Sequence, residues 1–335
     1  MTARRLATYS MRLKTPLLAL AISLASAAAM AQQTEPPRFG IKRTQLPMAS
    51  LRRIATISLG GSPDWLAISE DAVWVANSKF KAVQRIDPKT NSLVAKIEFS
   101  KEPCSGLAYA FGSLWVPLCG NPASLARVDP HTNRLVATLP FGPTDSEGGI
   151  ATSVDSVWLV ADENGTLLRI DPRTNAIRQR ITIPPGSFNP LYSSGFLWIT
   201  GNKSSLLTPV NALTGAVLPG IPVGPQPRFL ASDGSYVWTL NQGDGSITRV
   251  DARTRQAVAT IQAGIAGHGG DICYGAGAVW ATLFDIPLTM VFVESDQVLH
   301  QWVGPGGDAI RFGLGSLWLT DLRNGLLWRF NPPKS

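Results

Sequence analysis

The sequence predicts an all-β fold, and three observations support this prediction. Tryptophan recurs at a nearly fixed interval of 41, 43, 40, 40, 42 and 38 residues, at Trp74, Trp115, Trp158, Trp198, Trp238, Trp280 and Trp318. No stretch shows a sustained helical period of 3.6 residues. The 31 glycines and 25 prolines are typical of many short strands joined by turns. Because a four-stranded repeat of about 40–45 residues is the signature of a β-propeller, seven tryptophans predict seven blades.

Each repeat has the same internal order. A turn precedes the strand that carries the tryptophan, and the next strand ends in Arg-Ile-Asp or Arg-Val-Asp. The clearest copies of the following turn and strand are RIDPKTNSLVAKI (85–97), RVDPHTNRLVATL (127–139) and RIDPRTNAIRQRI (169–181). In this turn the aspartate can accept a bond from the backbone two residues on, proline presets φ, and asparagine tolerates the left-handed conformation. We therefore expect four short strands per repeat, joined by tight hairpins.

The seven repeated tryptophans are expected to pack between neighbouring blades. They share one strand position, and an aromatic side chain buries about 150–250 Å². A tryptophan that contacts a ligand should instead fall outside the repeat, as Trp65 does.

The two ends of the repeat region predict how the ring closes. Residues 51–60 (LRRIATISLG) resemble the last strand of a repeat, whereas the chain ends at 326–330 (LLWRF), which resembles a third strand. The N-terminal strand should therefore complete the last blade, which leaves no open edge between first and last blades.

The N-terminus resembles a secretory signal. Four basic residues precede an apolar stretch at 16–25 and the small residues Ala29-Met30-Ala31. We expect residues 1–31 to be a signal peptide, 32–50 a flexible linker and 51–335 the propeller, in a periplasmic or secreted protein.

Composition limits the partners. The whole chain carries 30 basic and 23 acidic residues, a net charge of +7. Removing the four basic residues of the signal leaves 26 against 23, a net charge of +3, which is ordinary for solubility. We therefore expect no nucleic-acid partner. The apolar stretch at 16–25 is too short to span a bilayer, so we expect no stable membrane insertion, and we expect a monomer.

Three cysteines are too few for a disulfide framework, but two of them can pair. If the hairpin of the second repeat turns at Phe111 and Gly112, Cys104 and Cys119 face each other with Cα atoms about 5.5 Å apart. Export would permit this disulfide. Cys273 should remain a buried free thiol.

The candidate site lies at the mouth of the central channel, by analogy with other propellers. Counting back about nine to twelve residues from each tryptophan places Asp64, Trp65, Arg228, Asp271 and Asp308 there. Acids slightly outnumber bases, so the mouth could hold Mg²⁺ or Ca²⁺, which prefer oxygen ligands. A hydrated polar rim is the alternative, and the sequence identifies no metal ligands.

Of the three histidines, only His268 is placed at the mouth, in the glycine-rich stretch AGHGGD. A general base near neutral pH is most often histidine. We expect His268 to lie near Asp271, where a neighbouring acid would favour the charged imidazolium and the binding of an anionic group. A loop histidine without a role is the alternative.

The pattern VWVAN followed by RIDPxTNxLVAxI resembles the bacterial YVTN-type seven-bladed propeller repeat, over about residues 51–330. It is also similar to the repeat of the virginiamycin B (streptogramin B) lyase family. This resemblance implies a metal-assisted elimination by a pair of histidines and glutamates at the mouth. His268 and Glu147 are the matching candidates here, and a second mouth histidine is missing.

These observations lead to one preferred function and one alternative. We expect an exported propeller that binds a small-molecule or protein ligand at its mouth. The alternative is a lyase similar to the streptogramin B family, or a lactonase-type metal hydrolase, acting at the same mouth.

Overall fold

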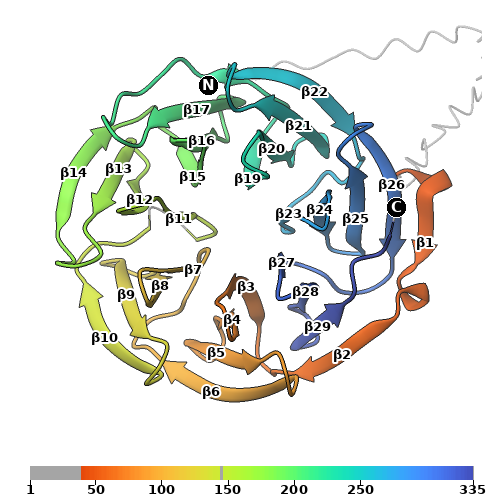
Figure 1. The fold of residues 1–335 in the computed structure, drawn as a ribbon, viewed down its shortest axis with the longest axis horizontal. Helices are drawn as coiled ribbons and strands as arrows, with labels where there is room; N and C mark the ends of the chain where they lie inside the picture. The colour runs from red at the N-terminus through yellow and green to blue at the C-terminus, as the bar shows by residue number, and fades with distance from the viewer. Residues whose placement is uncertain (1–38, 144–145, 335) are drawn as a thin grey trace, which may run out of the picture. The chain divides into compact units, whose positions relative to one another are not determined.

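The computed structural model describes residues 39–143 and 146–334, which form a ring of seven β-sheets around a central channel (Figure 1). The sheets are the seven blades predicted from the tryptophan spacing. The predicted signal peptide at 1–31 lies outside the described residues.

In blades 1 to 4 the four strands follow one another along the chain, each antiparallel to its neighbour. Blade 1 comprises β3 (Pro63–Ile68), β4 (Val73–Asn77), β5 (Ala82–Asp87) and β6 (Ser92–Glu98). Blade 2 comprises β7 (Ala108–Ala110), β8 (Ser113–Leu118), β9 (Ser124–Asp129) and β10 (Arg134–Leu139). Blade 3 comprises β11 (Ile150–Thr152), β12 (Val157–Asp162), β13 (Thr166–Ile170) and β14 (Ile177–Thr182). Blade 4 comprises β15 (Ser187–Ser193), β16 (Phe196–Gly201), β17 (Leu206–Asn211) and β18 (Ile221–Pro222).

The remaining blades complete the ring. Blade 5 comprises β19 (Pro227–Ser232), β20 (Tyr236–Asn241), β21 (Ser246–Asp251) and β22 (Gln256–Gln262). Blade 6 comprises β23 (Ile272–Gly275), β24 (Ala278–Leu283), β25 (Ile286–Phe292) and β26 (Gln297–Val303). Blade 7 comprises β27 (Ile310–Gly313), β28 (Ser316–Asp321) and β29 (Leu326–Phe330), completed by β2 (Arg53–Ser58).

The N-terminal strand closes the ring, as predicted. β2 pairs antiparallel with β29, with Thr56 opposite Trp328 and Ser58 opposite Leu326. The first strand of the propeller and the last are thus neighbours in one sheet.

The described residues before β2 add an element that the sequence did not indicate. Residues 42–50 form two 3-10 turns, Lys42–Thr44 and Met48–Ser50, on either side of β1 (Gln45–Pro47). β1 lies parallel to β26 as a fifth strand on the outer edge of blade 6. Residues 42–50 of the expected linker are therefore docked on blade 6. A strand that pairs in parallel with a distant strand is not joined to it by a hairpin, so no turn signal in the sequence indicates the pairing.

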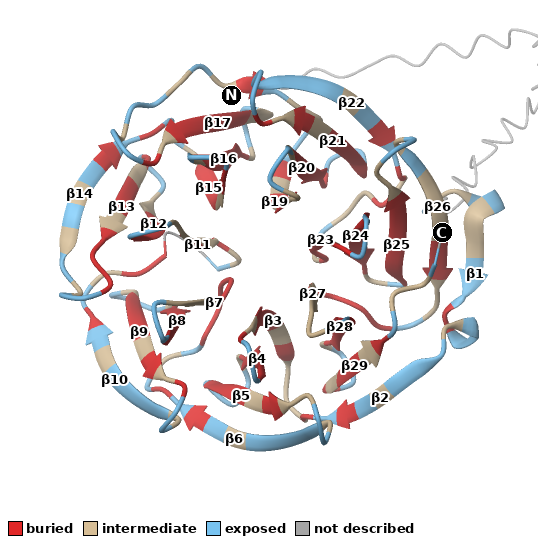
Figure 2. Cartoon of the chain, in the orientation of Figure 1, coloured by how far each residue is buried: buried red, intermediate tan, exposed pale blue. Residues whose placement is uncertain are grey.

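The repeated tryptophans are fully buried and join adjacent blades. All seven have a relative exposure of 0%. Trp115, for example, shares a hydrophobic cluster with Val157 and Leu159 of the next blade, and Trp318 shares one with Val73. The outermost strands β6, β10 and β22 are largely exposed, whereas the strand of each blade that carries the tryptophan is buried (Figure 2). The hydrophobic core therefore lies between the faces of the blades.

The turns adopt the conformation that the sequence predicted. The aspartate carboxylate accepts the N–H two residues on, as Asp87 does from Lys89 at 2.7 Å and Asp129 from His131 at 2.8 Å. Asn91 has a φ of 53° and Asn133 a φ of 56°. We call the end of the ring that carries these turns the turn face, and the end where the inner strands begin the mouth face.

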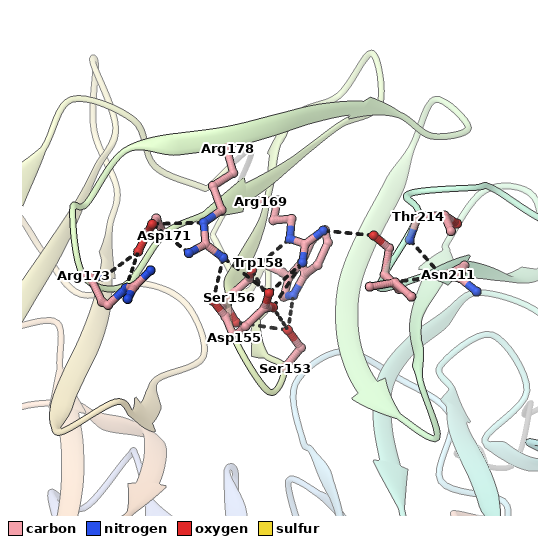
Figure 3. A network of polar contacts seen from close by, with 11 residues as sticks. Ser153, Asp155, Ser156, Trp158, Arg169, Asp171, Arg173, Arg178, Asn211 and Thr214 are labelled. Atoms are coloured by element: carbon pink, nitrogen blue, oxygen red, sulfur yellow. Dashed lines mark hydrogen bonds and ion pairs between the residues drawn. The ribbon is translucent and has the colours of Figure 1, made fainter.

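Arginines on the turn face connect neighbouring blades. Five lie on the third strand opposite the blade tryptophan: Arg85, Arg127, Arg169, Arg249 and Arg329. The guanidinium of Arg127 lies 5.0 Å from the Trp115 ring centre and donates to the Pro172 carbonyl (2.7 Å) and Asn175 (3.0 Å) of the next blade. Arg169 donates to the Leu213 carbonyl of blade 4 at 3.2 Å and also pairs with Asp155 at 2.9 Å (Figure 3). We call these five residues the junction arginines.

The cysteines behave as predicted. Cys104 and Cys119 form a disulfide with a Cα–Cα distance of 5.7 Å, and Cys273 is a buried free thiol. Burial raises the pKa of the Cys273 thiol to about 12, so this side chain stays protonated. Among the described residues there is no helix long and apolar enough to cross a membrane.

Candidate ligand site at the channel mouth

All seven blades contribute to one small cavity in the channel, which we call the channel pocket. It has a volume of about 90 Å³. Its lining residues include Trp65, Gly106, Gly149, Asn189, Phe229, Asp271 and Arg311. A wider cavity of about 400 Å³ lies farther along the same strands toward the turn face, lined by residues such as Ile68, Tyr109 and Tyr192.

Trp65 reaches across the channel. Its ring meets that of Phe229 from blade 5 edge-on, with ring centres 5.5 Å apart. Its indole N–H is buried and has no acceptor among the described residues. A buried donor without an acceptor costs about 1–3 kcal/mol, so an acceptor supplied by a ligand would be favourable here.

Asp64 and Asp308 form a hydrogen-bonded carboxyl pair between blades 1 and 7. Burial and the neighbouring charge of Asp308 raise the pKa of Asp64 well above its usual range, so this side chain keeps its proton and donates it. Burial, together with the charges of Asp271 and Glu147, raises the pKa of Asp308 to about 7 despite the N–H of Gly270, which donates to it at 2.9 Å. Near neutral pH the pair therefore gains or loses one proton.

Asp271 is only 2% exposed and joins blades 6 and 7. Its carboxylate accepts the Ile272 N–H at 2.8 Å and the Ile310 N–H at 3.2 Å, and it forms an ion pair with Arg311. Burial raises the pKa of Asp271, whereas the Arg311 guanidinium opposes that effect. These contacts give Asp271 a clear structural role at the inner edge of the two blades.

Glu147 and Arg228 form the next part of the mouth. A terminal nitrogen of Arg228 lies 2.6 Å from the Glu147 carboxylate, and the guanidinium stacks over Phe188 at 4.3 Å. The Arg228 Nε–H is buried and, like the Trp65 indole, lacks an acceptor among the described residues. Glu147 also lies close enough to raise the pKa of Asp64, so this ion pair and the carboxyl pair belong to one cluster.

Arg228 also lines a larger cavity on the mouth face, which we call the outer mouth pocket. Its volume is about 370 Å³. The lining residues are Glu163, Pro185, Gly186, Ser187, Phe188, Asn202, Lys203 and Arg228. This is the size of a small-molecule site, and one wall carries the Arg228 side chain that contacts the channel cluster.

His268 lies apart from this cluster. It is exposed and lines a separate cavity with Phe39, Phe284 and Asp285, next to the docked N-terminal segment. Its distance along the chain from Trp280 identified the loop but not the position of the loop relative to the channel axis. The structure therefore brings together Asp64, Trp65, Glu147, Arg228, Asp271 and Asp308, but not His268.

Arg311 was not among the site residues predicted from the sequence. It lines both channel cavities and pairs with Asp271. A signal was present, because the position seven residues before the tryptophan is alanine in blades 1, 2, 3 and 5 but arginine in blade 7.

The acidic residues of the mouth are already engaged with each other or with arginine. Within residues 39–143 and 146–334, no three His, Cys, Asp or Glu side chains are grouped so that they could hold a metal ion.

No protein-family model matches the chain, and no curated protein matches it either. The seven-bladed fold agrees with the resemblance to propeller repeats, and the finer resemblance to one activity rests on the repeat residues alone.

Proposed function

We propose that the protein is an exported propeller that binds a small polar molecule at the mouth of its channel. The observation that supports this most directly is the pair of buried donors, Trp65 Nε1–H and Arg228 Nε–H, that lack acceptors among the described residues. Both side chains contact Phe229, at 5.5 Å and 5.8 Å between ring or guanidinium centres; Trp65 lines the channel pocket and Arg228 lines the outer mouth pocket.

Charge at the mouth favours an uncharged ligand that carries acceptor oxygens. Glu147 is balanced by Arg228 and Asp271 by Arg311, which leaves the Asp64–Asp308 pair, where Asp64 stays protonated and Asp308 gains or loses a proton near neutral pH. An anionic ligand would meet this carboxyl pair, and a cationic one would compete with the two arginines. A neutral ring with hydroxyl or amide oxygens would satisfy the donors without either cost.

Three versions of one sugar ring test this proposal. We expect N-acetylglucosamine, which is neutral and has an amide acceptor, to bind more tightly than anionic glucuronate or cationic glucosamine, as measured by saturation-transfer NMR. Trp65→Phe should weaken this binding because the donor is lost, whereas Trp302→Phe, a buried tryptophan of the outer strand of blade 6, should not. Preference for a charged ring, or equal binding by the two variants, would contradict the proposal.

Export is supported by the signal-like residues 1–31 and by the Cys104–Cys119 disulfide, which is compatible with an oxidising compartment. Fractionation of producing cells, with N-terminal sequencing of the product, tests this part separately. We expect a chain that begins after Ala31, outside the cytoplasm.

A further inference from the structure

The junction arginines are absent from two blades, and the two gaps differ. In blade 6 the position is held by Met290, which packs in a hydrophobic cluster with Trp280 and Phe330. The blade that follows has no turn to receive an arginine, because its third and fourth strands come from opposite ends of the chain. In blade 4 the position is held by Pro209, opposite Trp198, and the next blade does have the turn.

The turn of blade 5 also lacks the two residues that accept a junction arginine in the turn of blade 2. Ala252 and Arg255 stand where the corresponding turn of blade 2 has Pro130 and Asn133, the two acceptors of Arg85. No described residue donates a hydrogen bond to the Ala252 carbonyl. Arg255 has a φ of 56°, as Asn133 does, and its guanidinium extends back over the ring of Phe196 at 5.6 Å.

A cavity of about 470 Å³ lies at this junction, on the turn face between blades 4 and 5. We call it the junction pocket. Its lining residues are Ser194, Phe196, Gly234, Ser235, Tyr236, Asp251, Ala252, Arg253 and Arg255. The pocket therefore contains two aromatic rings, two arginines and hydroxyl groups. It lies where a junction arginine lies in each of the other blades whose next blade has a turn between its third and fourth strands.

The charges of the junction pocket favour an anion. The Asp251 carboxylate is held by the backbone N–H groups of Arg253 (2.9 Å) and Thr254 (2.7 Å) within its own turn. The two arginines therefore outnumber the single acid, and the described residues include no ion-pair partner for Arg255. A guanidinium binds a carboxylate or phosphate through paired hydrogen bonds, and Phe196 and Tyr236 can cover an apolar or ring-shaped body.

We propose that the junction pocket is a second binding site, separate from the channel mouth, for a small molecule with a planar or apolar body and one carboxylate or phosphate group. Arg255 binds the anionic group, and Phe196 and Tyr236 contact the body. The site exists because Pro209 removes the arginine that would otherwise fill it.

Phenyl phosphate and benzoate are the probes, with neutral benzyl alcohol and cationic benzamidine as matched controls. By ligand-observed NMR on the wild-type protein, we expect binding of at least one anion and none of the two controls at the same millimolar concentration. The two anions separate a phosphate preference from a carboxylate preference. Binding of neither anion, or equal binding of the controls, would overturn the proposal.

Two variants place the binding at this pocket. Arg255→Ala should weaken the anion at least tenfold, whereas Arg173→Ala, which removes an exposed arginine from the turn of blade 3 where the junction arginine is present, should not. The double variant Pro209→Arg/Arg255→Asn rebuilds the junction of the other blades. It should weaken the anion by at least the same factor while raising the melting temperature. A folded double variant that binds as the wild type does would refute the proposal.

Discussion

Replacement of Asp308 by asparagine should remove the part of the pH dependence of stability that Asp308 contributes. The pKa of Asp308 is about 7 in the folded protein against an ordinary value of 3.8, because the carboxyl is buried. A raised pKa means that the folded chain holds a proton that the unfolded chain has released. The stabilisation is therefore complete below about pH 4 and is lost as the pH rises through 7.

The size of the effect follows from the shift. A difference of one pKa unit corresponds to about 1.4 kcal/mol, so the full effect is roughly 4 kcal/mol. Roughly 3 kcal/mol of that falls between about pH 5 and pH 8. Backbone N–H donors lower the pKa values of four turn aspartates, Asp87, Asp129, Asp171 and Asp251. The stability that these carboxylates contribute is lost as the pH falls, and only at more acidic pH.

Urea unfolding followed by tryptophan fluorescence at constant ionic strength measures this dependence. Between about pH 5 and pH 8, Asp308→Asn should lose roughly 3 kcal/mol less unfolding free energy than the wild type does, because the contribution of Asp308 is gone. The asparagine keeps the oxygen that accepts the Gly270 N–H, and its amide can donate to Asp64. Asp64→Asn should also flatten the dependence, because folded Asp64 holds a proton that the unfolded chain has released. An unchanged slope in Asp308→Asn would refute this explanation.

Three further outcomes can be checked. Cys104→Ser/Cys119→Ser should lower the unfolding free energy by about 3 kcal/mol, the effect expected for a closed loop of 15 residues; equal stability in wild type and variant under oxidising conditions would contradict it. Deletion of residues 51–60 should abolish cooperative unfolding, because β29 loses its partner strand; an unchanged melting curve would exclude closure through this strand. Millimolar Mg²⁺ or Ca²⁺ should not raise the melting temperature, because the mouth carboxyls already bind one another or arginine, and a rise that is lost on mutating them would reveal a cation site.

The blade architecture could be predicted because its signals are local and repeated. The tryptophan recurs in all seven repeats, and the Asp-Pro turn with its left-handed asparagine recurs in three, at Asn91, Asn133 and Asn175, so the copies reinforce one interpretation. The disulfide followed from the same hairpin geometry. β1 could not be predicted in this way, because its partner β26 lies at the far end of the sequence and no turn connects the two.

The site was only partly predictable for a related reason. Spacing from a tryptophan identifies the loop on which a residue lies, and this was enough to gather Asp64, Asp271 and Asp308 at the mouth. It does not determine the radial position of a side chain, so His268 was expected in the channel and lies in an outer cavity. The contact of Trp65 with Phe229 joins blades that are far apart in sequence, and no local pattern indicates it.

Closure through β2 imposes an order on the folding of the chain. β2 is among the first strands to leave the ribosome, and its partner β29 is the last. At about 5–20 residues per second, roughly 15–50 s of synthesis separate the two. During this interval the early blades can form while β2 has no sheet to join, so the ring is completed only after the last residues are released. Any factor that protects the chain from aggregation has that interval in which to act on an open arc.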